Sequence, residues 1–271
     1  MAEATPPRRR PFMNRAVDSQ PRQTAVKPAS MKRSIILAIG LLCSAGTPVR
    51  AVKIEHKSLA LDFTYGWPSE AAAISPLDWR LRDQMAKAYR DALANAHEDQ
   101  AVAREQKRPY NQHFFSMEWS TAGETPRLLS LQSELSTFTG GAHPNTSYNA
   151  LLWDRRTSQQ ISFSALLTGR ANIASLMRSD YCKALDAERL KRRQGEKLGG
   201  VFDECPKLSD LAIALADQDK NGRFDMIAFV ASPYVAGPYA EGEYDISLPV
   251  TARFIAALKP AYRGSFEAQR Q

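Results

Sequence analysis

The first regular pattern of apolar and polar residues covers positions 57–67, where the two kinds alternate. Such alternation over a short run is typical of a β-strand that buries one face. The residues on the apolar face are Leu59, Leu61, Phe63, Tyr65 and Trp67. We therefore expect a half-buried strand over this segment.

Apolar residues then recur at intervals of three and four, which predicts a long amphipathic helix over about residues 76–106. Its apolar positions are Leu77, Leu81, Met85, Ala88, Tyr89, Ala92, Leu93 and Ala96. Ser75 is expected to be the N-cap, with Pro76 at the first helical position and Asp78 as a carboxylate in the first turn.

Three further runs, residues 112–121, 126–138 and 147–154, have the composition of strands. The turns between them are predicted at Gly123-Glu124 and at residues 140–145. Consecutive strands with short connections imply an antiparallel meander.

Helical spacing returns over residues 164–198, and strand-like runs follow at 208–216, 223–231 and 243–250. The apolar face of this second helix is Ile173, Leu176, Met177, Tyr181, Ala184 and Leu185. Each half of the chain thus combines strands with a helix. This predicts an α+β fold, with antiparallel sheets and two long helices packed on one face.

Charge is distributed unevenly along the 271 residues. The chain has 36 Lys and Arg against 29 Asp and Glu, and the whole excess lies in residues 1–51, with nine basic and two acidic residues. Residues 52–271 are balanced, so the charge does not indicate a nucleic-acid partner. A content of 44% hydrophobic residues excludes a wholly disordered chain. The lack of any apolar run of about twenty residues excludes a polytopic membrane protein.

Residues 31–51 have the three parts of a signal peptide. Two basic residues form the charged start, residues 34–45 form the apolar stretch, and Ala51 ends a small-residue cleavage site before Val52. A helix of about a dozen residues spans about 18 Å, which is short of the roughly 30 Å core of a bilayer. We therefore predict a periplasmic or secreted protein that contacts the membrane only during export.

Residues 1–30 are rich in Pro, Arg, Ser and Thr and have no periodic apolar pattern. We expect them to be disordered, or to precede a true start at Met31. The alternatives for the leader are an uncleaved anchor, a lipoprotein signal at Cys43 and a twin-arginine signal using residues 8–10. The bulky Leu42 disfavours the lipoprotein signal, and the distance of the arginines from the apolar stretch disfavours the twin-arginine signal.

Export also bears on the cysteines. After removal of the leader, Cys182 and Cys205 remain, an even number with one possible pairing. An oxidising compartment favours a disulfide between them. Two buried free thiols are the alternative, because disulfide geometry cannot be read from sequence.

The segment 217–225 carries oxygen side chains in the order of a calcium loop. Positions 1, 3, 5 and 9 are Asp217, Asp219, Asn221 and Asp225, and position 6 is a glycine. The twelfth position lacks the bidentate glutamate, and the flanking residues look like strands rather than helices. A polar hairpin turn is therefore the favoured interpretation. Calcium is the only cofactor that the sequence suggests.

Gly140, Gly141 and His143 form a turn motif between two predicted strands. The other histidines have no metal-ligand spacing with His143. A hydrogen bond of the His143 ring that fixes the turn is the favoured interpretation. No G-x-S-x-G element is present and no spacing of carboxylates selects an acid–base pair, so the sequence indicates no catalytic residue.

Several motifs together resemble a known family. They are residues 140–145, residues 152–154 followed by 161–167, and residues 229–242. This arrangement resembles the paired uncharacterised domains that stand beside the catalytic domain in PdaC-type peptidoglycan deacetylases and form the extracellular half of RsiV-type anti-sigma factors. The resemblance covers about residues 58–255.

The resemblance implies a cell-envelope domain with a PdaC-like subdomain over residues 52–150 and an RsiV-like subdomain over residues 151–271. In the anti-sigma factors this domain binds lysozyme, which implies a docking surface on the late loop of this chain. The implied contacts are Pro233, Tyr234, Tyr239 and Glu241. The alternative is that Pro and Gly shape a β-corner while the tyrosines pack into the core. The metal-ligand motif of the deacetylases is absent from the sequence, so that activity is not carried over.

Together these observations predict an exported binding module for a protein or a glycan of the cell envelope rather than an enzyme. The alternatives are an enzyme or accessory domain acting on peptidoglycan, and a membrane-anchored envelope sensor. Trp67, Trp79, Trp119 and Trp153 could stack on sugars, although scattered tryptophans are more often found in the core.

Overall fold

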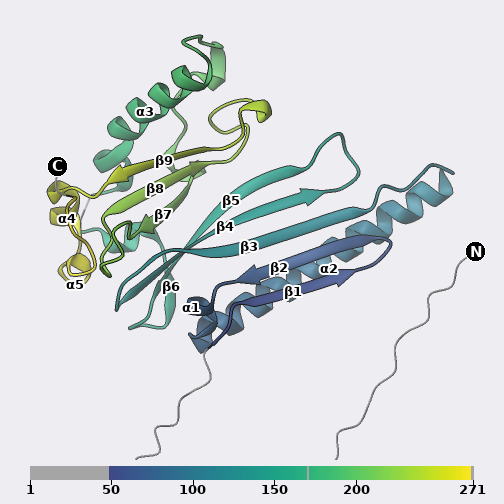
Figure 1. Ribbon diagram of the computed structural model, residues 1–271, viewed down its shortest axis with the longest axis horizontal. Helices are drawn as coiled ribbons and strands as arrows, with labels where there is room; N and C mark the ends of the chain where they lie inside the picture. Colours follow the sequence, from purple (N-terminus) through teal and green to yellow (C-terminus); the bar gives the residue numbers. More distant parts are fainter. Residues whose placement is uncertain (1–48, 170, 270–271) are drawn as a thin grey trace, which may run out of the picture. The chain divides into compact units, whose positions relative to one another are not determined.

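The computed structural model describes residues 49–169 and 171–269, which form two sheets with one long helix against each (Figure 1). The strands of the first sheet, in spatial order, are β1 (Val52–Lys57), β2 (Leu61–Trp67), β3 (His113–Glu124), β4 (Leu128–Phe138), β5 (Asn145–Asp154) and β6 (Gln159–Ile161). The strands of the second sheet are β7 (Ala212–Ala216), β8 (Met226–Ala231) and β9 (Tyr244–Pro249). The long helices are α2 (Ser75–Glu105) and α3 (Ile173–Arg192). This confirms the predicted α+β fold.

The β2–β3 pair is parallel, whereas the other neighbouring strands are antiparallel. The sequence had predicted antiparallel strands throughout. The difference arises because α2, with 31 residues, lies between β2 and β3 and returns the chain to the end from which β2 started. A short helix, α1 (Ser69–Ala72), connects β2 to α2.

The predicted apolar stripe of α2 faces the first sheet, where Leu77 and Leu81 are fully buried. The N-cap is Ile74 rather than Ser75, and it makes no side-chain capping bond. Asp78 has a different role from the one expected at a helix start. It accepts hydrogen bonds from Trp67 Nε1 at 2.9 Å and from Arg82 Nε at 2.7 Å, and so ties the helix to β2.

The strand predicted over residues 57–67 begins later than expected. Leu59 is 88% exposed, because it lies in the turn between β1 and β2. Ser58 Oγ accepts hydrogen bonds from the amides of Ala60 and Leu61, which closes that turn. From Leu61 to Tyr65, buried and partly buried residues alternate as the sequence predicts.

The second helix is shorter than its apolar spacing suggested. Asn172 caps α3, with its side chain accepting from the Ser175 amide at 2.8 Å. The preceding residues form a short 3-10 turn, η1 (Phe163–Leu166), in place of the predicted start of the helix. Two short helices, α4 (Ala252–Ala257) and α5 (Pro260–Arg263), complete the C-terminal part.

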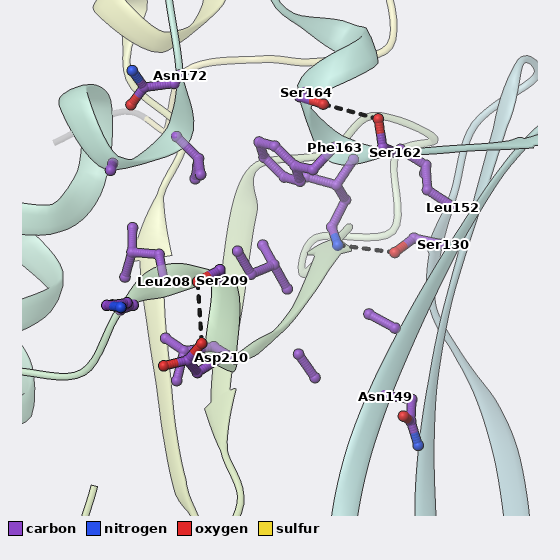
Figure 2. A pocket seen from close by; sticks show the side chains of 18 of the residues that line it. Ser130, Asn149, Leu152, Ser162, Phe163, Ser164, Asn172, Leu208, Ser209 and Asp210 are labelled. Carbon is purple, nitrogen blue, oxygen red and sulfur yellow. Dashed lines mark hydrogen bonds between the residues drawn. The ribbon is translucent and has the colours of Figure 1, made fainter. Parts of the chain in front are cut away.

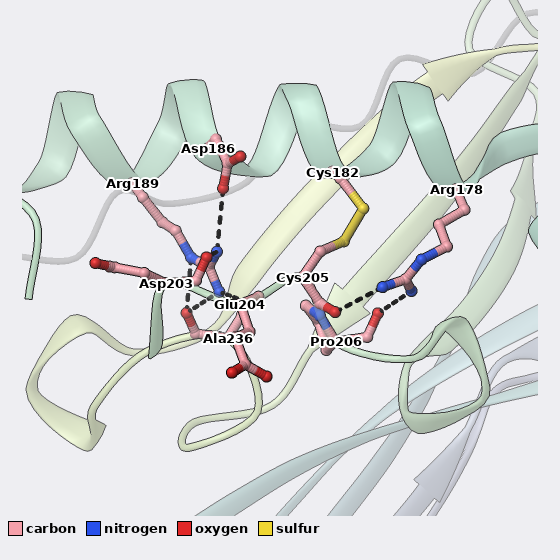
Figure 3. The surroundings of a disulfide bond; sticks show 9 residues. All are labelled: Arg178, Cys182, Asp186, Arg189, Asp203, Glu204, Cys205, Pro206 and Ala236. Carbon is pink, nitrogen blue, oxygen red and sulfur yellow. Dashed lines mark hydrogen bonds and ion pairs between the residues drawn. A yellow bond between two sulfur atoms is a disulfide. The ribbon is translucent and has the colours of Figure 1, made fainter. Parts of the chain in front are cut away.

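A disulfide between Cys182 and Cys205 joins α3 to the loop that leads to β7, as the sequence predicted (Figure 3). The loop is held on both sides of the bond. Arg178 donates to the carbonyls of Cys205 and Pro206, and Arg189, which is buried, donates to the carbonyl of Glu204. Arg189 also donates to the carbonyl of Ala236, in the loop between β8 and β9. The disulfide therefore lies within a network that fixes the loops around the second sheet.

The two sheets contact each other directly. Leu128 and Leu152, from the first sheet, belong to the core that covers the second sheet. The Leu215 amide of β7 donates to Ser130 Oγ of β4 at 2.9 Å. The boundary placed between residues 150 and 151 falls inside β5, so both of the predicted subdomains contribute to the first sheet.

Residues 1–30 and most of the predicted signal peptide, residues 31–51, lie outside the described residues. Ala51 is exposed, and Val52 begins β1. Within the described part of the chain, no helix combines the length and the apolar content needed to span a membrane.

Candidate functional site

The fold brings the β4–β5 turn and the β8–β9 loop together. The rings of His143 and Tyr239 stack with centroids 4.0 Å apart, and Tyr234 lies beside Tyr239 at 5.7 Å. Tyr234 Oη also approaches His143 Nε2 at 3.5 Å. We call these three residues the aromatic cluster. It unites residues of the turn motif with residues of the implied docking loop.

Two hydrogen bonds hold these segments in place. Tyr239 Oη donates to the carbonyl of Pro144 at 2.9 Å. The Tyr148 amide, at the start of β5, donates to Ser232 Oγ at 3.0 Å. The aromatic cluster is therefore supported by strands of both sheets rather than by a free loop.

The β4–β5 turn depends on the conformation of its residues. Gly140 has φ +84°, a conformation that favours glycine, whereas Gly141 does not require it. His143 Nδ1 lies 2.8 Å from the Pro144 carbonyl, the kind of bond within the turn that the sequence favoured. A carbonyl partner makes Nδ1 the protonated nitrogen of a neutral ring, which leaves Nε2 as the acceptor facing Tyr234.

Tyr234 combines exposure with backbone strain. Its side chain is 54% exposed, and its φ of +72° lies in the left-handed region that non-glycine residues rarely adopt. The Tyr234 amide donates to the Gly237 carbonyl at 3.0 Å, which stabilises this turn. Strain of this kind is concentrated at functional sites, because only surrounding contacts can maintain it.

Glu241, one of the implied ligand contacts, is engaged within the protein. Its two carboxylate oxygens accept from Arg193 Nε and Nη2 at 2.8 and 2.9 Å, and its side chain is only 15% exposed. These hydrogen bonds hold the pKa of Glu241 below its ordinary value. Gly237 packs against this carboxylate, where a Cβ would collide with Oε2. Glu241 thus positions the loop, whereas Pro233 is half-buried beside Tyr234.

The acidic segment after β7 has the hydrogen bonds of a polar turn. Asp217 accepts from the amides of Asn221 and Gly222, and Asp225, which is buried, accepts from the Gln218 amide. Asp219 also accepts hydrogen bonds from Asn221. Strands β7 and β8 flank the turn, as the sequence indicated. In residues 49–169 and 171–269, no three His, Cys, Asp or Glu side chains are grouped so that they could hold a metal ion.

A cleft of about 1080 Å³ separates β5 and β6 from the N-terminal end of α3, the turn η3 (Leu208–Asp210) and β7 (Figure 2). Hydroxyl and amide side chains line it together with apolar ones. Burial, together with Glu243, raises the pKa of Tyr148, in the lining of the cleft, to about 12. Sequence reasoning missed this cleft, because its lining residues come from segments assigned to regular strands and helices.

Three of the four tryptophans are in the core, as scattered tryptophans usually are. Trp67, Trp119 and Trp153 are at most 9% exposed. Trp79, on the outer side of α2, is 71% exposed and lies outside the aromatic cluster. It provides an exposed aromatic residue for comparison with Tyr234.

Residues 54–146 match the family model described as "Deacetylase PdaC". The resemblance to PdaC-type domains is therefore confirmed for this segment, and the match suggests an envelope-associated domain. None of the comparisons supports the RsiV-like part of the resemblance. No curated protein matches the chain.

Two solved structures have a similar fold. A DUF3298 family protein from Pseudomonas aeruginosa PAO1 is 15% identical, with a TM-score of 0.51, over 82% of this chain and 99% of that one. A member of the DUF3298 family from Bacteroides fragilis is 13% identical, also with a TM-score of 0.51, over 80% of this chain and 96% of that one. At these identities the similarity concerns the fold alone.

Proposed function

We propose that this protein is an exported binding module of the cell envelope, which recognises a protein or a glycan through the aromatic cluster. The observation that carries the proposal is the exposed Tyr234, held at positive φ with Tyr239 and His143 beside it. A tyrosine in such a position offers a large contact area and loses little conformational entropy on binding. Its phenol can hydrogen-bond either a protein or a sugar.

Export is supported by two features of the chain. The disulfide is of the kind that persists in oxidising compartments. The excess positive charge lies in residues 1–51, the later part of which has the pattern of a signal peptide, and residues 52–271 are balanced. These features support the proposal that the protein acts in the periplasm or outside the cell. The resemblance to lysozyme-binding domains makes lysozyme the first protein probe.

Titration calorimetry with lysozyme and, separately, with chitotetraose tests the proposal. We expect the wild type to bind one of these probes. Tyr234→Ala and Tyr239→Ala should each weaken that binding by about tenfold or more, because a central aromatic contact is worth about 2 kcal/mol.

Trp79→Ala is the matched control, since it removes an exposed aromatic side chain from α2 and should leave the affinity unchanged. Binding of neither probe by the wild type, or equal affinities of the wild type and both tyrosine variants, would contradict the proposal.

A further inference from the structure

The cleft is bordered by strands from the edges of both sheets. Among the described residues, β6 is the last strand of the first sheet and pairs with β5 alone, and β7 is an outer strand of the second sheet. Both contribute residues to the lining of the cleft, among them Ile161 and Ile213. The edge of a sheet presents N–H and C=O groups without a neighbouring strand, which another extended chain can pair with.

The direction of the Leu215 amide shows which main-chain groups of β7 face away from β8. This amide donates to Ser130 Oγ of the first sheet, so it points away from the second sheet. In an antiparallel ladder every second residue turns its N–H and C=O to the same side. Ile213 therefore also turns its main-chain groups away from β8, and within the described residues no strand pairs with β7 on that side.

The first sheet contacts β7 closely at the C-terminal end of that strand. There, Gly123 of β3 approaches so closely that a Cβ would lie 2.7 Å from the Asp217 amide nitrogen. Earlier in β7, Ile213 lines the cleft together with residues 162–164 and 208–210 (Figure 2). The main-chain groups of Ile213 that turn away from β8 therefore border the cleft.

Hydroxyl and apolar side chains follow one another along both walls of the cleft beside this edge. Ser162 and Ser164 flank Phe163 on one wall, and Ser209 follows the buried Leu208 on the other. An extended peptide places successive side chains on opposite sides, which suits walls that offer both apolar and hydroxyl contacts. A glycan has no main-chain pattern of donors and acceptors that repeats at the spacing of a strand.

We propose that this cleft binds an extended peptide segment, which adds to the edge of β7 as an extra strand and alternates apolar with hydroxyl side chains. The peptide donates to and accepts from the main chain of Ile213, and its apolar side chains contact Phe163 and Leu208. This site is distinct from the aromatic cluster and does not depend on the function proposed for it.

The probe is an N-acetylated, C-amidated hexapeptide of alternating threonine and valine, titrated against the full chain by calorimetry. Two N-methylated forms, one methylated at all valines and the other at all threonines, each remove the donors from one edge of the peptide. Because one edge must face β7, we expect at least one of them to bind ~tenfold or more weakly than the parent peptide.

Ala174→Trp blocks the cleft on the protein side, because Ala174 is an exposed residue of its lining. It should weaken peptide binding, whereas Ala187→Trp, at an exposed position of the same helix outside the cleft, should not. Tyr234→Ala should leave peptide binding unchanged, which separates this proposal from the proposed function.

Three results would overturn the proposal. These are no saturable binding of the parent peptide, equal affinity for the parent and both methylated forms, or equal binding by Ala174→Trp and the wild type. Binding of chitotetraose that is lost in Ala174→Trp, without any binding of the peptide, would assign the cleft to a glycan instead.

Discussion

Glu241 and Tyr234 belong to the same loop and have opposite environments. The Glu241 carboxylate is held by Arg193 with 15% of its side chain exposed, whereas 54% of Tyr234 is exposed. The first residue positions the loop and the second forms its surface. Arg193 lies 48 residues before Glu241 in the chain, so no local pattern could show that this carboxylate has a partner.

Glu241→Gln should destabilise the protein at neutral pH, and the loss should become smaller in acid. Hydrogen bonds from Arg193 hold the pKa of Glu241 below its ordinary value of 4.5. The ionised carboxylate therefore contributes stability that is present above the ordinary pKa and is lost as the pH falls through the lowered, folded-state pKa. Urea unfolding measures this, and we expect a loss of about 1–3 kcal/mol at about pH 7 and less at about pH 3. Equal losses at both pH values would contradict the expectation.

Tyr234 should illustrate a conflict between stability and binding. At φ +72° a glycine has no steric penalty, whereas any residue with a Cβ does. We expect Tyr234→Gly to exceed Tyr234→Ala in unfolding free energy by about 1 kcal/mol, while both lose ligand binding. Comparing two variants that both lack the ring isolates the backbone strain. If the alanine variant is as stable as the glycine variant, the strain is not present in solution.

Among single residues, the sequence could select the members of the site but not bring them together. His143 and Tyr234 were both singled out from their local motifs, yet they are 91 residues apart in the chain. Their contact depends on long-range hydrogen bonds between β5 and the residues that follow β8, such as that of Tyr148 with Ser232. Local spacing contains no information about such a contact.

At the scale of elements, the ends of a helix could be predicted where they coincide with the ends of its run of apolar residues at helical spacing. Apolar residues at helical spacing extend along most of α2, and the limits of the helix were predicted within one residue. In α3 the apolar spacing continues beyond the helix into η1. There the capping interaction of Asn172 with Ser175 decides the start, and it is a weaker signal than hydrophobic spacing.

The disulfide should contribute strongly to the stability of the segment between α3 and β7. The bond closes a sequence separation of 23 residues. Replacing Cys182 and Cys205 together with alanine should therefore lower the unfolding free energy by about 3 kcal/mol. Guanidinium unfolding with and without dithiothreitol measures the effect. The reductant should destabilise the wild type and leave the double variant unchanged, and a wild type insensitive to it would refute the prediction.

At the scale of the whole described molecule, the contact between the sheets depends on a glycine. Gly123 lies in an irregularity of the β3–β4 pairing, and its Cα approaches the main chain of β7. The sequence indicated only a turn at this position. The parallel pairing of β2 with β3 was equally hidden, because alternation within a strand does not reveal which neighbour it will have.

Gly123→Ala should loosen the contact between the sheets. An added Cβ would lie 2.7 Å from the Asp217 nitrogen and 3.0 Å from the Leu215 carbonyl oxygen, so main-chain atoms would have to move. We expect a loss of about 1–3 kcal/mol in unfolding free energy, measured by urea denaturation. Gly141→Ala is the control, because nothing lies within 4 Å of its added Cβ. Equal stability of the two variants would argue against the close approach.

The position of β5 has a consequence for where the chain can be divided. The segment that matches the PdaC family model ends at residue 146, the second residue of β5. A fragment that ends there would leave β4 paired with β3 alone. It would lack Asp154 and Leu151, the partners in β5 of Leu128 and Leu131, both of which are fully buried in the complete fold. We therefore expect a chain cut at residue 146 to be less stable than the complete fold.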